Sequence, residues 1–335
     1  MSDLLQVKDL AIRLYTQHGV VHAVNHVSFS LAEQETLAVV GESGSGKSIM
    51  CKGIMHLLPS TGRIESGSVC LEGQDIAHYS DRQMRKINGN RIAMIFQDPM
   101  TSLNPTMPVG KQITEVLREH TAMTEKQMEQ RAVELLGMVG ISDPARRMKQ
   151  YPHQFSGGMR QRVVIAIALA CDPGVLIADE PTTALDVTIQ AQILGLMRQL
   201  QQRIHTSIIL ITHNLGVVAS IAQRVAVMYG GQIVETGLVD EIFYQACHPY
   251  TRGLLESIPD IHDKVNELRT IPGTPPDLVD PPKGCPFAAR CPQAMKVCRL
   301  VPPAVKEISP THRAACWLMD DRAAAARRAR KEGSK

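Results

Sequence analysis

One segment near the N-terminus constrains the fold more than any other. It reads Gly41-Glu42-Ser43-Gly44-Ser45-Gly46-Lys47-Ser48, which is the G-x-x-x-x-G-K-S pattern of a phosphate-binding loop. Strand-like residues 37–40 precede it and helix-like residues 49–58 follow it, which disfavours the alternative of a Gly/Ser-rich surface turn. Glycines let backbone N–H groups surround phosphate oxygens, while Lys47 supplies a charge and Ser48 a hydroxyl for Mg²⁺. The segment predicts an α/β domain that binds a nucleoside triphosphate.

The composition predicts one large domain and a smaller one. The chain has 335 residues, of which 44% are hydrophobic. Its longest apolar run, residues 163–171, is far shorter than the roughly 20 residues that span a bilayer. Residues 1–13 lack the basic and apolar regions of a signal peptide. We therefore expect a cytoplasmic protein that meets a membrane only through another protein.

The charge distribution argues against a nucleic-acid partner. The net charge is +3, but residues 322–335 contain six basic residues and one acidic residue, so the rest of the chain carries −2. Aromatic residues make up only 4% of the chain, which leaves few platforms for stacking on bases. The basic tail, residues 321–335, is expected to be a solvated and partly helical end. Contact with anionic lipid headgroups is the alternative.

Polar residues follow several buried, strand-like segments. They are Gln97, Asp179, Glu180 and His213. Ligand contacts in α/β proteins collect at the carboxyl ends of strands, so we expect these side chains to lie near one another. One of the two carboxylates can bind Mg²⁺ through water, and the other can polarise a water that attacks the γ-phosphate. His213 is placed to reach the same phosphate.

A second anion-binding device is expected at residues 151–162. Ser156 is the predicted N-cap of an apolar helix, and Gly157 and Gly158 leave the helix N-terminus open to a ligand. Before this segment, residues 105–147 have apolar positions at helical spacing and no catalytic motif. We expect an inserted helical subdomain there, which offers a surface to a partner.

The N-terminal residues are expected to form short strands. Residues 4–12 and 21–40 alternate in polarity, with a turn at residues 17–19 between them. Tyr15 lies just before that turn. Its ring is a candidate for stacking on adenine, and ordinary packing is the alternative.

Together these motifs resemble the ATP-binding cassette (ABC) ATPases. The resemblance covers residues 4–258 and keeps the order of the family's motifs. It implies a P-loop ABC-type nucleotide-binding domain over residues 1–258, with its helical subdomain at about residues 100–170. Phe155 stands where Leu is common, Met159 where Gln is common, and Asn214 where an acid is common. None of these departures removes a catalytic group, so we expect hydrolysis of ATP.

The resemblance also implies a role for each motif. Glu180 is expected to be the general base and His213 the sensor of the γ-phosphate. Two such domains close head to tail in the family, so the signature segment of one subunit completes the site of the other. The residues that the resemblance assigns to ATP and Mg²⁺ are Tyr15, Gly41, Glu42, Ser43, Gly44, Ser45, Gly46, Lys47, Ser48, Gln97, Asp179, Ser156, Gly157, Gly158, Met159, Gln161 and Asp186, with Ser48, Gln97 and Asp179 for Mg²⁺.

The chain further resembles the ATPases of dipeptide and oligopeptide importers. The segments that carry this likeness are residues 96–105, 178–190, 248–251 and 272–276. It implies uptake of dipeptides or short peptides at the cytoplasmic face of the inner membrane. The implied partners are two transmembrane permeases, a second and unlike ATPase, and indirectly a periplasmic or surface peptide-binding protein. Sibling importers of glutathione, nickel or other solutes are the alternative. A soluble cassette protein of translation or DNA repair is disfavoured, because neither a second cassette nor a long coiled-coil insertion is visible.

Four cysteines near the C-terminus suggest a metal site. They are Cys285, Cys291, Cys298 and Cys316. Residues 281–298 contain too few large apolar side chains to fold by core burial alone, and a reducing cytoplasm favours a metal over disulfides. Spacing alone leaves zinc and a [4Fe–4S] cluster equally open, with free thiols as a further alternative. The resemblance to importer ATPases favours the cluster. We expect a Cys-rich extension over residues 259–320 that helps to fix the facing subunit.

Overall fold

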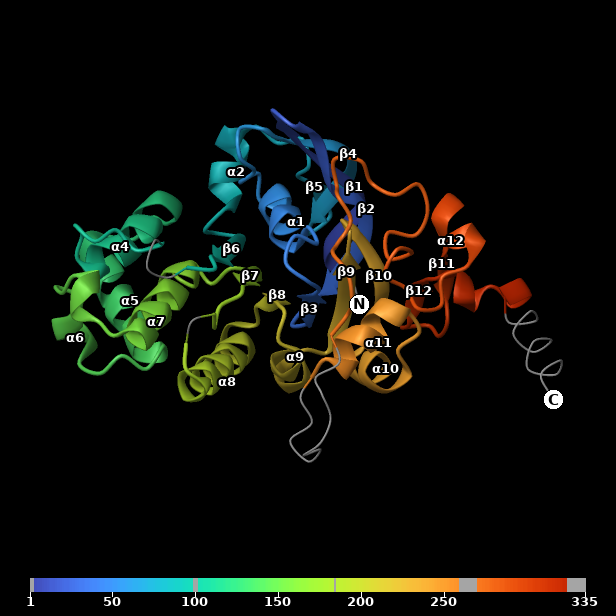
Figure 1. Ribbon diagram of the computed structural model, residues 1–335. Coiled ribbons are helices and arrows are strands. Elements are labelled where there is room, and N and C mark those ends of the chain that lie inside the picture. The colour runs from blue at the N-terminus through green and yellow to red at the C-terminus, as the bar shows by residue number, and fades with distance from the viewer. Residues whose placement is uncertain (1–2, 99–101, 184, 259–269, 324–335) are drawn as a thin grey trace.

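A large mixed sheet forms the centre of the molecule (Figure 1). The computed structural model describes residues 3–98, 102–183, 185–258 and 270–323. Within these residues the large sheet has the strand order β11-β12-β10-β9-β3-β8-β7-β6, and the pairs from β9 to β6 are parallel. Its strands are β3 (Thr36–Val40), β6 (Ile92–Ile95), β7 (Val175–Asp179), β8 (Ser207–Thr212), β9 (Arg224–Tyr229), β10 (Gln232–Leu238), β11 (Val305–Glu307) and β12 (Arg313–Ala315).

The parallel strands of this sheet are buried on both faces. In β8, Ile208 and Leu210 pack into the core beneath the helices α7 (Gly157–Ala168) and α8 (Val187–Ile204). Their neighbours Ile209 and Ile211 point to the opposite core. Because successive side chains of a strand face opposite ways, a continuous apolar run marks a strand that is covered twice. The carboxyl ends of these strands carry the predicted polar residues.

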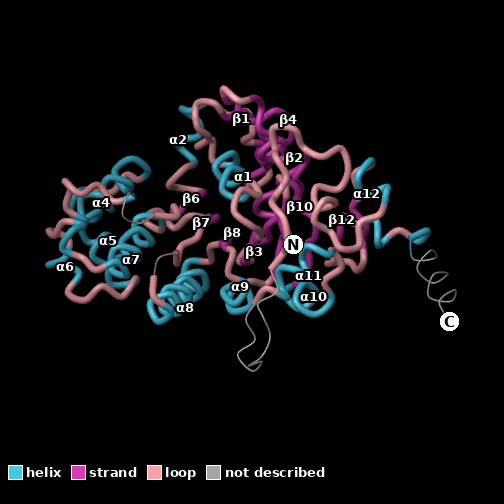
Figure 2. Tube along the Cα trace, viewed as in Figure 1, coloured by secondary structure: helices cyan, strands magenta, loops and turns pink. Residues whose placement is uncertain are grey.

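A smaller antiparallel sheet covers one side of the large sheet. Its order is β2-β1-β4-β5, and the helices α1 (Lys47–Ile54) and α2 (Asp81–Ile87) belong to the same layer (Figures 1 and 2). The turn predicted at residues 17–19 joins β1 to β2. The strands are β1 (Asp3–Thr16), β2 (Gly19–Ala32), β4 (Gly62–Leu71) and β5 (Gln74–Asp75).

Residues 21–40, expected to form short strands, contain most of β2 and all of β3, and the chain changes sheets between these two strands. β2 ends at Ala32 in the small sheet and β3 begins at Thr36 in the large one. Between them Gln34 has a left-handed φ of 59°, and the Glu35 side chain accepts a hydrogen bond of 2.7 Å from the Ala32 backbone. This turn redirects the chain from the small sheet to the large one.

The segment predicted to be helical, residues 105–147, contains three helices. Figure 2 shows them with α7 as a helical group at one side of the sheets. They are α4 (Val109–His120), α5 (Glu125–Met138) and α6 (Pro144–Arg147), and the short helix η1 (Pro152–Gln154) leads to α7. The apolar faces of α4, α5 and α7 pack together and against β6 and α8.

The C-terminal segment 270–323 lies against the other end of the large sheet. Its strand β12 pairs with β10, so the segment extends the sheet by two strands. The buried Phe287 ring packs against Tyr229 and Tyr250. The remaining elements of this half are α9 (Leu215–Ile221), α10 (Val239–Gln245), α11 (Pro249–Glu256), α12 (Lys296–Leu300) and η2 (Trp317–Met319). In the described part of the chain, no helix has the length and apolar character to cross a membrane.

Parts of some predictions fall outside the described residues. These parts are residues 99–101 and 184 of the importer-like segments, residues 259–269 of the expected extension and residues 324–335 of the basic tail.

A buried histidine predicts how stability depends on pH. His248 is 1% exposed, and its Nδ1 accepts a hydrogen bond from the Tyr250 backbone at the start of α11. Its Nε2 has no hydrogen-bond partner among the residues that the structure describes. Burial, with a smaller contribution from Arg252, lowers the pKa of His248 to about 4. The unfolded chain therefore binds more protons than the folded chain between about pH 4 and 6.5, and stability falls as the pH is lowered through this window.

The loss attributable to His248 should be about 1 kcal/mol per pH unit inside the window. His248→Asn keeps a hydrogen-bond acceptor at the helix N-cap and removes the titrating ring. The free energy of unfolding, obtained from chemical denaturation at several pH values, should therefore depend less on pH for the variant than for the parent chain. Parallel pH profiles for the two proteins would contradict the assignment.

Candidate functional site

The phosphate-binding loop needs glycine where it enters α1. Gly46 has a φ of 100°, which side chains rarely tolerate. A Cβ atom at this position would lie only 2.3 Å from the Ala23 carbonyl oxygen of β2. The loop thus follows a path that the neighbouring strand leaves open only to glycine.

Lys47 lies in the first turn of α1 with its ammonium group folded back into the loop. Its Nζ donates hydrogen bonds to the Gly41 carbonyl at 2.8 Å and the Glu42 carbonyl at 2.7 Å. The residue is only 6% exposed. Burial lowers the pKa of Lys47, while the carboxylates of Glu180 and Asp179 act in the opposite direction. The loop therefore presents a concentrated positive charge where its backbone N–H groups converge.

Ser48 and Asp179 meet beside the loop. The Ser48 hydroxyl donates a hydrogen bond of 2.9 Å to Asp179 Oδ1 at the end of β7. Burial raises the pKa of Asp179, and the bond from Ser48 opposes that rise. A divalent cation would favour the ionised carboxylate. A hydroxyl and a carboxylate are oxygen ligands of the kind that Mg²⁺ prefers, so this pair fits such an ion.

Glu180 gathers three hydrogen bonds on one carboxylate. Gln97 Nε2 lies 3.0 Å and Thr183 Oγ1 2.8 Å from Glu180 Oε2, while His213 Nδ1 lies 3.1 Å from Oε1. Burial raises the pKa of Glu180, but the bonds from His213 and Thr183 outweigh it, so the pKa lies below its usual range. The carboxylate is therefore ionised at neutral pH and held in one orientation.

The Glu180 backbone has a left-handed φ of 46°. For a residue with a side chain this conformation costs about 1 to 2 kcal/mol, and such strain is found preferentially at functional sites. It bends the chain directly after β7 and turns the side chain toward Gln97 and His213. The structure thus brings together all four of the polar residues predicted at strand ends. Thr183 was not among the predicted residues, and its signal was its place in the Glu-Pro-Thr-Thr run that follows Asp179.

The second predicted anion-binding segment lies apart from the phosphate-binding loop of the same chain. Figure 1 shows α7 in the helical group beside β6, whereas the loop joins β3 to α1 in the centre. The Ser156 side chain caps α7 by accepting from the Met159 backbone at 3.4 Å, as predicted. Ser156 and Gly157 are exposed, and no atom outside the local backbone lies within 4 Å of a Cβ built on Gly157. This helix N-terminus is therefore accessible at the surface of the described residues.

The other residues assigned to this segment differ in exposure. Asp186 is exposed and caps α8, accepting from the Ile189 backbone at 2.9 Å. Met159 is partly buried against the helical core. Gln161 is only 1% exposed, and neither of its side-chain polar atoms has a hydrogen-bond partner among the described residues. In this conformation Gln161 points into the protein.

Tyr15 stands at the end of β1 with 47% of its surface exposed. Its hydroxyl donates a hydrogen bond to the Glu65 carboxylate, and its backbone N–H bonds to the Thr61 carbonyl at 2.8 Å. These contacts fix the ring and leave about half of it uncovered. Stacking on adenine stays a prediction.

The four late cysteines share one region of the C-terminal segment. The Cys285 backbone N–H bonds to the Cys298 carbonyl at 2.7 Å, and a Cβ on Gly284 would lie 2.2 Å from that carbonyl. Burial, with smaller contributions from the nearby Cys316, Cys298 and Cys291, raises the pKa of Cys285 to about 12. Burial, with smaller contributions from Cys291, Cys298 and Glu235, raises the pKa of Cys316 to about 11. None of the four forms a disulfide.

Comparison with known proteins identifies the family. A family model described as ABC transporter matches residues 24–183, and one described as oligopeptide/dipeptide transporter, C-terminal region, matches residues 234–298. The oligopeptide transport ATP-binding protein OppD of Bacillus subtilis is 58% identical over 321 residues, covering 95% of this chain and 90% of that protein. The chain belongs to the ABC transporter ATPases of the oligopeptide/dipeptide family. The dipeptide transport ATP-binding protein DppD of the same organism is 54% identical, covering 96% of this chain and 97% of that protein.

Solved structures agree with the fold of this ABC ATPase. The dimeric structure of MJ0796, a bacterial ABC transporter cassette, gives a TM-score of 0.63 at 27% identity and covers 70% of this chain and 98% of that one. The structure of cbiO1 from Clostridium perfringens gives a TM-score of 0.63 at 26% identity, covering 73% of this chain and 93% of that one. The predicted α/β fold of a P-loop ABC ATPase is thereby confirmed.

Two of the family departures have a structural account. Asn214 caps α9, accepting hydrogen bonds from the Gly216 and Val217 backbones at 3.0 and 3.3 Å, a role that aspartate and asparagine fill equally well. Phe155 is buried at 3% exposure beneath the guanidinium of Arg147, which lies 5.7 Å from its ring centre.

Proposed function

We propose that this chain is the ATP-hydrolysing subunit of a membrane importer for dipeptides or short peptides. The observation that carries the proposal is similarity over nearly the whole chain to proteins named for oligopeptide and dipeptide transport. The match of residues 234–298 to the C-terminal region of such transporters supports it from a part of the chain outside the phosphate-binding loop.

In this proposal the phosphate-binding loop holds ATP. Lys47 and the backbone N–H groups of residues 41–48 bind the β- and γ-phosphates. Ser48 and Gln97 would hold Mg²⁺, and Asp179 would hold it through water, which agrees with the hydrogen bond between Ser48 and Asp179. The ion supplies positive charge against the phosphate oxygens.

Glu180 is the proposed general base. Its lowered pKa keeps it ionised, and its fixed orientation suits it to accept a proton from the attacking water. His213 has 65% of its side chain exposed beside that carboxylate, so it can meet the γ-phosphate from the open side of the site. Tyr15 is the proposed platform for adenine.

A second ATPase chain would complete the site. The exposed N-terminus of α7, with Ser156, Gly157 and Gly158, is proposed to bind the ATP held by a facing subunit. The proposed interface between the two subunits also includes Met159, Gln161 and Asp186. The dimeric arrangement named for the MJ0796 cassette supports such an assembly. We propose that the facing subunit is a homologue and not a copy of this chain.

The membrane path lies in other subunits. We propose that the chain sits peripherally on the cytoplasmic face of the inner membrane and drives two transmembrane permeases, which receive peptides from a periplasmic or surface binding protein. Phe96 is 41% exposed next to Gln97, which provides an apolar contact where a permease could sense the state of the ATP site.

Capture of the complex tests this function. Tagged chain carrying Glu180→Gln would be purified with ATP from detergent-solubilised membranes, beside the parent chain without nucleotide. Two multi-span proteins and a second, different ATPase should accompany the variant. Recovery of ribosomes or DNA, or of no membrane protein, would overturn the proposal. The binding protein encoded with the captured permeases would then be assayed with dipeptides.

We also propose a Cys-rich extension that holds a [4Fe–4S] cluster, with zinc as the alternative. Four free thiols in one region match the ligand set of such a cluster. The raised pKa values of Cys285 and Cys316 mean that without a cation these thiols stay protonated, and metal binding would displace the protons. The cluster would cross-link the C-terminal segment, and the cross-linked segment would help to hold the facing subunit in position.

Anaerobically purified protein should be brown and contain about four irons and four sulfides per chain, the content of the proposed cluster. Iron, sulfide and zinc analyses of the parent chain and of Cys298→Ser measure this directly. Cys70→Ser, in the small sheet, is the matched control and should keep the metal. One zinc per chain without sulfide would contradict the cluster and indicate a zinc site.

A further inference from the structure

The C-terminal segment contacts the phosphate-binding loop directly. Arg290 donates to both carboxylate oxygens of Glu42, the second residue of the loop, at 2.6 and 3.1 Å. The Arg290 side chain is only 6% exposed. Its remaining N–H groups bond to the carbonyls of Pro272 and Ile271, at 2.8 and 3.0 Å, and to the Tyr229 hydroxyl at 3.2 Å. A buried, fully bonded guanidinium of this kind is a rigid element.

The Glu42 backbone is held from the same half of the chain. Its N–H donates a hydrogen bond of 2.8 Å to the hydroxyl of Tyr250, a residue with 0% exposure. Its carbonyl accepts the bond of 2.7 Å from Lys47 Nζ. Glu42 is therefore fixed through its backbone and its side chain together, and its carbonyl helps to set the position of Lys47.

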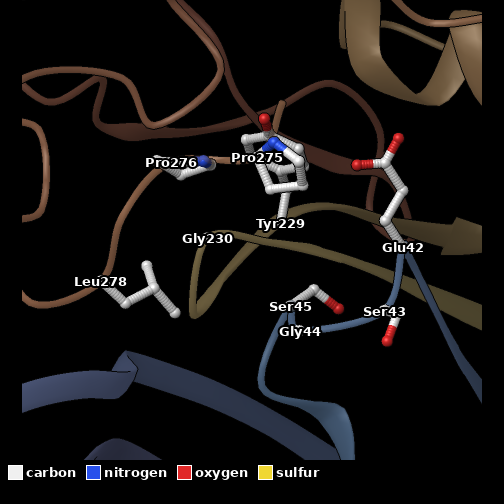
Figure 3. A pocket seen from close by; sticks show the side chains of 9 residues that line it. All are labelled: Glu42, Ser43, Gly44, Ser45, Tyr229, Gly230, Pro275, Pro276 and Leu278. Carbon is white, nitrogen blue, oxygen red and sulfur yellow. The ribbon is translucent and has the colours of Figure 1, made fainter. Parts of the chain in front are cut away.

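A proline-containing part of the C-terminal segment, residues 275–278, lies beside the phosphate-binding loop. Figure 3 shows Ser43, Gly44 and Ser45 on one side of a small pocket, with Pro275 and Leu278 on the opposite sides. Past the pocket, the Leu278 carbonyl accepts a hydrogen bond of 2.8 Å from the backbone of β2, at His22. This bond joins the C-terminal segment to β2, the strand whose Ala23 carbonyl borders Gly46 of the loop.

The ion pair also has an electrostatic consequence for ATP. Glu42 places a carboxylate in a loop whose ligand carries several negative charges, and its field reaches Lys47, whose pKa it raises. The guanidinium of Arg290 neutralises this carboxylate at contact distance. Without Arg290, the loop would present an unpaired negative charge near the triphosphate and lose a fixed point of its backbone.

We propose that Arg290 is a positioning residue for ATP binding, which acts by holding and neutralising Glu42. The C-terminal segment is then part of the nucleotide site of its own subunit. Loss of the guanidinium weakens ATP binding, because repulsion from Glu42 appears and the loop loosens. The chemical step is unaffected, since the carboxylate cluster at Glu180 makes no contact with Arg290.

The test compares Arg290→Met with the double variant Arg290→Met/Glu42→Gln in the full-length chain. Methionine keeps much of the side-chain bulk, and glutamine keeps the shape of Glu42 without its charge. We expect Arg290→Met to weaken ATP binding about tenfold. The double variant should recover most of that affinity. In the assembled complex, KM for ATP should rise while kcat stays within about twofold.

Matched variants separate this role from a structural one. Arg290→Lys keeps the charge and loses the two-pronged geometry, so it should lie between the parent and Arg290→Met. Arg299→Met, at an exposed arginine of α12, should leave ATP affinity unchanged. The proposal fails if Arg290→Met lowers the melting temperature without changing ATP affinity, or if removing the Glu42 charge gives no recovery.

Discussion

Glu180→Gln should lower the rate of ATP hydrolysis by about 10² to 10⁴-fold, the usual contribution of a general base, while ATP still binds. Glutamine keeps the size of the side chain, and its one amide oxygen can still accept the hydrogen bond that Thr183 donates to Glu180 in the parent chain. Its NH2 group then faces His213 Nδ1, which can accept a hydrogen bond when that ring nitrogen is unprotonated. It cannot take a proton from water. ATP should therefore stay bound, and the closed pair of ATPase subunits should accumulate.

Phosphate release in the reconstituted complex and retention of labelled ATP on a desalting column measure the two halves of this prediction. Glu129→Gln, at an exposed position of α5, is the control and should hydrolyse ATP like the parent. Undiminished turnover by Glu180→Gln would show that another group accepts the proton. If Glu180→Gln lost both ATP binding and turnover, the substitution would have disturbed the phosphate-binding loop, and the result would not identify Glu180 as the base.

The sequence predicted the ATP site well because that site depends on local patterns. The loop before α1 has a spacing that few other structures use, and its glycines are required by the backbone, as Gly46 illustrates. Gln97 and His213 could be placed together without any pairing information. Each follows a buried strand, and parallel strands deliver their carboxyl ends to one edge of a sheet.

The contacts of the C-terminal segment could not be predicted in the same way. Arg290 and Glu42 are 248 positions apart and belong to no common pattern. The expectation of a segment with too little core of its own was reasonable, but Phe287 is buried in the core of the cassette and β12 pairs with β10. Such contacts between distant segments depend on the whole fold, and a count of apolar residues within one segment does not predict them.

Burial of polar side chains was the other quantity that sequence patterns left undetermined. Ser156 and Gln161 lie five positions apart on one predicted segment, yet one is exposed and the other is 1% exposed. A helix turns about 100° per residue, so neighbours in a motif face different surroundings. Only the packing of α7 against its neighbours decides which member of the motif another chain can reach.

Lys47→Met should weaken ATP binding by roughly 100-fold or more. The lysine supplies charge-assisted hydrogen bonds, each of which contributes about 1.5–3 kcal/mol, and methionine supplies none. The fold should survive, because a linear apolar side chain replaces a residue that is 6% exposed, and removal of a buried charge offsets the lost bonds to Gly41 and Glu42. Affinity for a fluorescent ATP analogue and the melting temperature are the two measurements.

Lys86→Met, at an exposed lysine of α2, controls for the change in net charge and should bind ATP like the parent. This comparison separates two explanations of phosphate binding. If backbone N–H groups and the helix N-terminus carried nearly all of the affinity, both variants would bind alike. A loss confined to Lys47→Met, at an unchanged melting temperature, assigns the decisive charge to the ammonium group, which in the free chain bonds to the carbonyls of its own loop.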